Sequence, residues 1–158
     1  MSVTKDEFRR ALGHFASGVT VVTSRCEDGL LRGITVSAFT SLSLDPPLVL
    51  ICIDKRASLH DYLKEGDHFA VNMLAEDQEL ISRRFASRDV ERFEGLGYRT
   101  ADTGAPLING ALAAIECRIA HTYPGGDHTI VIGEVIATHV TEGRPLAYFR
   151  GGYARLGP

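Results

Sequence analysis

Apolar positions recur along the chain at both helical and strand spacing, and strand spacing dominates. Thr4 and Glu7 have the spacing of a capping box, and the apolar residues that follow share one helical face, which predicts a first helix ending before Gly18. A second, short helix is predicted after Ser58 as its N-cap, and a third over residues 76–85, where acidic residues occupy the first turn. The apolar face of the first helix consists of Phe8, Ala11, Leu12 and Phe15.

Runs rich in β-branched and aliphatic residues, separated by turn signals, predict the strands. Two runs flank the turn Glu27-Asp28-Gly29 and predict a hairpin, and two long runs flank the Pro-Gly-Gly-Asp turn at 124–127 and predict another. Pro46 and Pro47 forbid helix and lead into a continuous apolar run that is expected in the middle of the core. The predicted strands are residues 19–24, 30–39, 48–53, 68–74, 111–123, 128–140 and 146–156, and residues 87–109 are predicted to be irregular.

This order of elements disfavours a doubly wound α/β sheet, because hairpins join most of the strands and helices do not alternate with them. An antiparallel barrel with peripheral helices fits better, since closure removes the exposed edges of a strand-rich chain. The 158 residues are enough to bury one core, and no segment has the composition of a linker. A single domain over residues 1–158 is therefore predicted, mainly β in class.

Composition and motifs argue against several classes of function. The net charge is -3 and the 17 Lys and Arg residues form no basic stripe, so neither nucleic acid nor an anionic membrane is expected as a partner. The N-terminus lacks the apolar core of a signal peptide, and no apolar run approaches the roughly 20 residues that span a bilayer, so a cytoplasmic location is predicted. Cys26, Cys52 and Cys117 are expected to be reduced thiols. No metal site is predicted, because the histidines show no metal-ligand spacing, and the glycine motifs of Rossmann, P-loop and serine-hydrolase sites do not occur.

Residues 33–48 form the candidate site, because five hydroxyl side chains occur close together before the double proline. A strand that only packs would not gather them, since each buried hydroxyl without a partner costs about 1–3 kcal/mol. A ligand outside the chain is therefore expected to satisfy them, and a flat, polar-edged, phosphorylated molecule suits the hydroxyls and the neighbouring aliphatic side chains. A serine-rich turn at the end of a strand explains the same residues equally well. The five are Thr35, Ser37, Thr40, Ser41 and Ser43.

Three further positions have both a functional and an ordinary interpretation. His128 begins a strand directly after a turn, where its side chain can project over a barrel mouth, although a surface turn histidine is the simpler interpretation. Lys55 and Arg56 either anchor a phosphate beside the helix that starts at Ser58 or are solvated loop cations. Phe85 either covers a planar ligand or belongs to the core, and its helical spacing favours the core.

In their shared order, five segments resemble the flavin reductase family that supplies reduced flavin to two-component monooxygenases, such as the phenol and 4-hydroxyphenylacetate hydroxylases. The resemblance covers nearly the whole chain, and the order of the segments is more specific than any one of them. The segments are residues 15–23 (FASGVTVVT), 33–48 (GITVSAFTSLSLDPPL), 104–107 (GAPL), 126–135 (GDHTIVIGEV) and 145–153 (PLAYFRGGY).

This resemblance implies a split β-barrel of the Greek-key, FMN-binding type that forms a homodimer and binds FMN or FAD near the subunit interface. It further implies that residues 35–38 edge the isoalloxazine ring, that Phe85 and Ala86 lie beside the flavin, and that His128 and Tyr153 face the nicotinamide of NADH or NADPH. The residues implied around the ribityl phosphate are Ser41, Leu42, Ser43, Cys52, Ile53, Asp54, Lys55 and Ser58. The remaining implied flavin contacts are Gly33, Ile34, Thr35, Val36, Ser37 and Ala38.

The activity that the resemblance implies is that of an NAD(P)H:flavin oxidoreductase, which supplies reduced flavin to a partner monooxygenase. Because the cofactors carry the hydride chemistry, from nicotinamide C4 to flavin N5, the protein needs to stack two rings and needs no strong acid or base. His128 is the candidate catalytic residue, in the role of positioning the carboxamide or the pyrophosphate. Two alternatives stay open, namely a split-barrel oxidoreductase that retains its FMN and acts on another substrate, and a non-enzymatic flavin-binding barrel.

Overall fold

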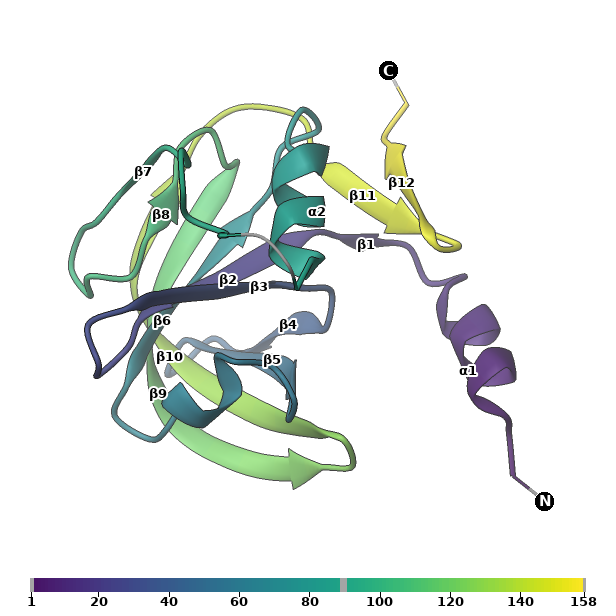
Figure 1. The fold of residues 1–158 in the computed structure, drawn as a ribbon, viewed down its shortest axis with the longest axis horizontal. Coiled ribbons are helices and arrows are strands. Elements are labelled where there is room, and N and C mark those ends of the chain that lie inside the picture. Colours follow the sequence, from purple (N-terminus) through teal and green to yellow (C-terminus); the bar gives the residue numbers. More distant parts are fainter. Residues whose placement is uncertain (1, 89–90, 158) are drawn as a thin grey trace.

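Seven strands form one antiparallel sheet in the computed structural model, which describes residues 2–88 and 91–157. The strand order across the sheet is β3-β2-β6-β9-β10-β5-β4. Some neighbouring strands are therefore consecutive in the chain, and others are joined by long connections that cross the sheet. Figure 1 shows that the sheet curls strongly and that α2 lies over one end of it. The strands are β2 (Thr20–Arg25), β3 (Leu31–Val36), β4 (Phe39–Ser43), β5 (Leu48–Asp54), β6 (His68–Met73), β9 (Ala113–Gly125) and β10 (His128–Val140).

The two edges of this sheet, β3 and β4, are consecutive in the chain. Only Ser37 and Ala38 separate them, so the chain steps across the opening of the curled sheet from one edge to the other. Among the described residues no ladder of backbone hydrogen bonds joins β3 to β4 or β5, and the sheet is open along this line. The prediction of a mainly β fold with peripheral helices is confirmed, whereas a sheet closed by hydrogen bonds is not what the structure has.

Smaller elements complete the fold, and two of them correct the predicted final strand. Residues 146–156 form a hairpin and not one strand, because Arg150 and Gly151 both have positive φ, 53° and 77°, the backbone of a tight two-residue turn. The hairpin strands are β11 (Leu146–Phe149) and β12 (Gly152–Arg155), and they form a three-stranded sheet with β1 (Ser17–Gly18). The other elements are β7 (Tyr98–Arg99), β8 (Leu107–Ile108), α1 (Lys5–Leu12), α2 (Glu79–Ala86) and the 3-10 helix η1 (His60–Tyr62).

Most predicted boundaries lie within three residues of the observed ones, and besides the final strand and the end of the first helix three predictions need correction. The strand predicted at 30–39 is divided between β3 and β4, because the chain changes edges there. The helix predicted after Ser58 is only the single turn η1, and Leu59, without a side-chain hydrogen bond, occupies the position of its cap. The stretch 87–109 is irregular apart from the two-residue strands β7 and β8, and its residues 89 and 90 lie outside the described residues.

The two larger parts of the core lie on the two faces of the sheet. Inside the curl, the side chains of β5 that point inward pack against those of β6, β9 and β10. The apolar run of β5 is thus not buried throughout, because this strand lies next to the sheet edge and its inward and outward residues alternate. The second part lies between the sheet and α2, where Phe85, Val21 and Leu74 are buried.

The first helix begins where the capping box predicts it, but it ends at Leu12, before Phe15, and does not pack into this core. Thr4 and Glu7 make both hydrogen bonds of the capping box. Nevertheless, none of the residues of α1 is buried, and Figure 1 shows the helix standing apart from the body of the protein. Its apolar side chains are therefore exposed, with Phe8 at 59% and Phe15, just beyond the helix, at 79%. No helix among the described residues is long and apolar enough to span a membrane.

The carboxylate of Glu116 on β9 is completely buried. Its Oε1 accepts hydrogen bonds from the backbone N–H and the hydroxyl of Thr103, and its Oε2 lies 2.9 Å from Nε2 of His139 on β10. Burial alone would raise the pKa of Glu116, but the hydrogen bonds from His139 and Thr103 together hold this pKa below its ordinary value. The carboxylate thus ties the loop at Thr103 to the long hairpin.

Replacing Glu116 with glutamine is expected to lower the free energy of unfolding by about 1–3 kcal/mol near neutral pH, because the amide cannot satisfy both partners as an acceptor. A carboxyl whose pKa is lowered by folding stabilises the protein above its unfolded pKa, and this stabilisation is lost as the pH falls through the folded pKa. The difference in melting temperature between wild type and Glu116→Gln should therefore shrink on acidification. Thermal unfolding across acidic and neutral pH measures it, with the exposed Glu134→Gln as control. A difference that does not change with pH would contradict this role of Glu116.

Candidate functional site

A cavity of about 280 Å³ lies at the opening of the sheet, between the edge strand β3 and the end of β5. The step from β3 to β4 forms one end of it, and His128 at the start of β10 lines it as well. Strand register places His128 opposite Asp54, so the first residue of β10 meets the last residue of β5 here. The lining residues are Ile34, Thr35, Val36, Ser37, Ala38, Cys52, Ile53, Asp54 and His128.

Backbone groups give this cavity a polar edge. β3 pairs on one side only, with β2, so its other side faces the opening without a strand partner among the described residues. Across the opening, the ladder between β4 and β5 ends at Ile51, and beyond it the N–H of Cys52 donates to the carbonyl of Ala38 at 3.0 Å. Such a strand edge offers alternating N–H and C=O groups to the rim of a flat heterocycle.

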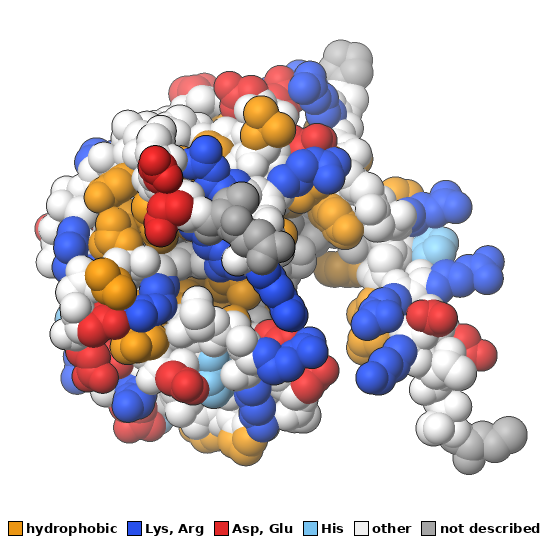
Figure 2. All heavy atoms as spheres, in the orientation of Figure 1, with side chains coloured by type: hydrophobic (Ala, Val, Ile, Leu, Met, Phe, Trp, Pro, Cys, Tyr) orange, Lys and Arg blue, Asp and Glu red, His pale blue; other side chains and the backbone are white. Residues whose placement is uncertain are grey.

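A second cavity, of about 420 Å³, continues from the first beneath α2. Ile34, Thr35 and Asp54 line both cavities, so the two cavities are continuous. Together they are called the cleft below. In Figure 2, Lys and Arg side chains gather around the hollow on this face of the molecule. The other residues that line the second cavity are Arg56, Ala57, Ser58, Leu59, Phe85, Ala86, Arg88 and Arg92.

Two ion pairs fix charged groups of the cleft close together, where the start of β10 meets the end of β5. Arg56 donates to Asp54 through its side chain and its backbone N–H, and these hydrogen bonds lower the pKa of Asp54 to about 2. His128 Nδ1 lies 2.7 Å from Oδ1 of Asp127, whose pKa this hydrogen bond lowers. Because an ionised carboxylate only accepts, Nδ1 carries the proton, and Nε2 of His128 is left for another partner. The imidazole is thus oriented before any ligand binds.

The half-buried Arg92 holds the rim of the cleft in place. Its guanidinium donates to the carbonyls of Ser87 and of Gly33, the latter on β3, and burial lowers the pKa of this group. Arg92 therefore connects the end of α2 to the strand that forms the polar edge. Its position and that of Arg88 were not predicted, although two arginines four residues apart, just after an amphipathic helix, are a recognisable signal for an anion site.

The prediction that hydroxyls of residues 35–43 lack partners within the chain is wrong. The hydroxyl of Thr35 donates to the carbonyl of Ser82 on α2 at 2.6 Å, and Ser37 and Ser41 are exposed. No buried side-chain nitrogen or oxygen atom among the described residues lacks a hydrogen-bond partner. The strand edge and the arginines, and not unsatisfied hydroxyls, give the cleft its polar groups.

The structure brings most of the predicted site residues together in the cleft and leaves six of them outside its lining. Gly33 lies behind the cleft, where a Cβ would come within 2.7 Å of the Phe85 ring. The side chain of Phe85 is fully buried and also lines the cleft, so the two interpretations of this residue are compatible. Tyr153 bonds Ser82 through its hydroxyl at 2.6 Å and does not line the cleft. The others outside the lining are Ser41, Leu42 and Ser43 on β4, and Lys55.

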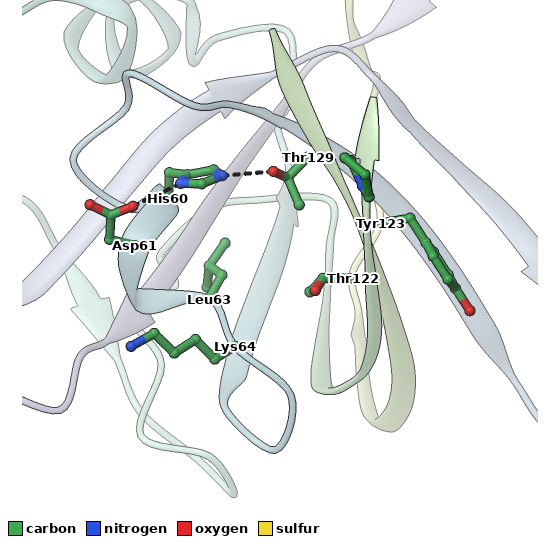
Figure 3. Close-up of a pocket in the computed structure, with 8 residues that line it drawn as sticks. His60, Asp61, Leu63, Lys64, Thr122, Tyr123 and Thr129 are labelled. Atoms are coloured by element: carbon green, nitrogen blue, oxygen red, sulfur yellow. Dashed lines mark hydrogen bonds and ion pairs between the residues drawn. The ribbon is translucent and has the colours of Figure 1, made fainter. Parts of the chain in front are cut away.

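A larger cavity of about 480 Å³, drawn in Figure 3, lies under η1 against the β9–β10 hairpin. His60 bridges Asp61 and the hydroxyl of Thr129 across it, at 2.9 and 2.7 Å. None of the predicted site residues lines this cavity. Its size alone does not make it the site, whereas the cleft combines a strand edge, aliphatic walls and guanidinium groups, which together suit a planar ligand that carries phosphate.

Comparison with known proteins identifies the family. Residues 12–157 match the model of the family described as flavin reductase like domain. The chain is 45% identical over 149 residues to FMN reductase (NADH) SmoA of Agrobacterium fabrum, covering 94% of this chain and 84% of that protein. It is 44% identical over 153 residues to the reductase component of 4-hydroxyphenylacetate 3-monooxygenase of Thermus thermophilus, covering 96% and 97%. The solved structure of Streptomyces globisporus NADH:FAD oxidoreductase SgcE6, in complex with NAD and FAD fragments, matches with a TM-score of 0.92 and 42% identity over 98% of this chain and 93% of that one.

The chain therefore belongs to the flavin reductase family. The predicted resemblance is confirmed, and so, at the level of the family, are an NAD(P)H-dependent flavin reductase activity and the cofactors flavin and nicotinamide dinucleotide. The roles of individual residues in the cleft stay predictions.

Proposed function

We propose that this protein is an NAD(P)H:flavin oxidoreductase that binds flavin in the cleft and releases it, reduced, to a partner monooxygenase. The observation that supports this most is the position of the cleft, at the one line where the curled sheet is open and β3 lacks a second strand partner among the described residues. A planar ring system inserted there would meet backbone donors and acceptors on its rim. Relatives named as reductase components of monooxygenases support the choice of partner.

Each part of the cleft has a role in this proposal. The edge of β3 and the residues of β5 hold the ring, with Ile34 and Ile53 against its faces. Arg56 and Ser58 meet the phosphate, which leaves Lys55 as a solvated cation. His128, oriented by Asp127, contacts the nicotinamide dinucleotide at the open end. When both ligands are bound, the dinucleotide supplies the hydride and the flavin accepts it, so the protein needs only to align the rings and keep the phosphate charges compensated.

The shape of the cleft favours release of the flavin over its retention. The cleft is a shallow opening along a strand edge, and Ser37, Ala38, Arg56 and Ser58 at its rim are exposed. A ligand that is not enclosed exchanges readily, which a reductase that serves a separate oxygenase requires. The cytoplasm stays the proposed location, because the reaction consumes intracellular nicotinamide dinucleotides.

A homodimer is also part of the proposal, in the form of a split barrel with the site near the subunit interface. Five exposed apolar side chains support this part of the proposal. They lie on or just after α1, which stands apart from the sheet, and on or just after the edge strand β4. A second copy that covers α1 and β4 would bury this surface. The molar mass of the purified protein in solution tests this part. The residues are Phe8, Leu12, Phe15, Leu42 and Leu44.

Steady-state oxidation of NADH and NADPH, with and without added FMN or FAD, tests the proposed activity. Turnover is expected to rise with the concentration of added flavin and to saturate. A protein that retains FMN for another substrate would show reduction of its bound flavin without turnover of free flavin. A non-enzymatic flavin-binding barrel would leave bound flavin oxidised when NADH and NADPH are added anaerobically. Either result would overturn the proposal.

A further inference from the structure

The cleft does not end at the residues proposed to meet the phosphate. A third cavity, of about 200 Å³, continues from it between the start of β3 and the segment that follows α2. Ser58, Arg88 and Arg92 line both this cavity and the cleft, so the two are contiguous at these three residues. This third cavity is called here the distal pocket.

At the junction between the cleft and the distal pocket, a hydroxyl and two guanidinium groups meet. Such groups bind phosphate oxygens through charge-assisted hydrogen bonds, and arginine does so with two donors at once. The guanidinium of Arg92 already donates to two backbone carbonyls, so its position is fixed. Arg88 is exposed and lines both cavities, and it is therefore the side chain best placed to meet a phosphate.

The walls of the distal pocket suit a flat ring. Leu31 and Phe93, both half-buried, contribute apolar surface, and Glu91 contributes a carboxylate that can accept from an exocyclic amine. Arg32 lines the pocket too, but its charge is compensated by two hydrogen bonds to Asp28 at 2.9 Å, and its guanidinium lies 3.9 Å from the centre of the Tyr62 ring. Arg32 is thus part of the wall and not a free phosphate ligand.

We propose that the distal pocket binds the adenosine half of FAD, and that this protein therefore prefers FAD to FMN. The inference rests on the proposed function. FMN ends at its single phosphate and would fill the cleft only. FAD adds a second phosphate, which would lie at the junction beside Arg88 and Arg92, and an adenosine whose base would pack between Leu31 and Phe93. The extra contacts are made by the adenosine half alone, so they separate the two flavins.

Equilibrium titration of the purified protein with FMN and with FAD, followed by flavin fluorescence, tests this preference. We expect FAD to bind at least about tenfold more tightly than FMN, the equivalent of one good charge-assisted contact. Arg88→Ala should weaken FAD binding about tenfold and change FMN binding less than about threefold, and Arg88→Lys should restore part of the loss. Arg99→Ala on β7, an exposed arginine outside the cleft and the distal pocket, is the matched control.

Three results would overturn the proposal. Equal affinities for FMN and FAD in the wild type would leave the distal pocket without a role in flavin binding. An equal loss for both flavins in Arg88→Ala would place this arginine on the first phosphate. Unchanged FAD binding together with weaker NAD⁺ or NADP⁺ binding in Arg88→Ala would assign the pocket to the adenosine diphosphate of the dinucleotide. Absence of any flavin binding would instead contradict the proposed function, so the two failures are distinguishable.

Discussion

Replacing His128 with alanine is expected to raise the KM for NADH or NADPH by about tenfold or more, and to weaken flavin binding by less than about threefold. The reason is geometric, because His128 lines the first cavity, to whose wall no arginine contributes among the described residues, with Nε2 available and Nδ1 held by Asp127. Loss of one hydrogen bond to a charged ligand group costs about 1.5–3 kcal/mol, which corresponds to about tenfold or more in apparent affinity. Steady-state kinetics with the flavin saturating, combined with flavin titrations, measures both quantities.

A matched control for His128 exists on the same hairpin. His121 of β9 is exposed and does not line the cleft, so His121→Ala should leave both constants unchanged. His128→Asn retains a donor and an acceptor and should recover part of the loss. If flavin affinity fell more than the KM for the dinucleotide rose, His128 would belong to the flavin site and the proposed orientation of the two ligands would be reversed.

Local sequence signals were sufficient to predict most of the elements of this fold. The capping box of α1, the β2–β3 turn and the Pro-Gly-Gly-Asp turn before β10 each depend on neighbouring residues only, and each is found where the pattern placed it. The failures concern features that depend on distant parts of the chain. Residues 30–39 read as one strand, because nothing local shows that the chain changes sheet edges at Ser37.

The candidate site shows the same division between local and distant information. Residues 34–38 line the cleft, although the hydroxyls in this stretch are not left unsatisfied, since Thr35 already donates to the carbonyl of Ser82. That partner lies 47 positions away in the sequence. Arg92 was missed because its role depends on Gly33, which only the packing of α2 over β3 brings near.

Replacing Phe85 with alanine is expected to lower the free energy of unfolding by about 3–5 kcal/mol, the usual cost of removing a buried aromatic ring. The side chain is fully buried between α2 and the sheet, and its ring lies edge-on to that of Phe93 with centroids 5.2 Å apart. Because domains of this size are stable by only about 5–15 kcal/mol, the loss should be evident in chemical denaturation. Leu80→Ala, on the exposed side of the same helix, should change the stability by less than about 0.5 kcal/mol.

A double-mutant cycle with Gly33 distinguishes a packing role of Phe85 from a role in ligand binding. A Cβ at Gly33 would come within 2.7 Å of the Phe85 ring, so Gly33→Ala alone should destabilise by about 1–3 kcal/mol through overpacking. In the background of Phe85→Leu, which removes the clashing ring, Gly33→Ala should cost much less, and the two changes should be non-additive by about 1 kcal/mol or more. Flavin affinity should change by less than about threefold in a folded Phe85→Leu protein. A tenfold loss of flavin binding there, with stability retained, would show that Phe85 acts mainly as a cover for the ligand.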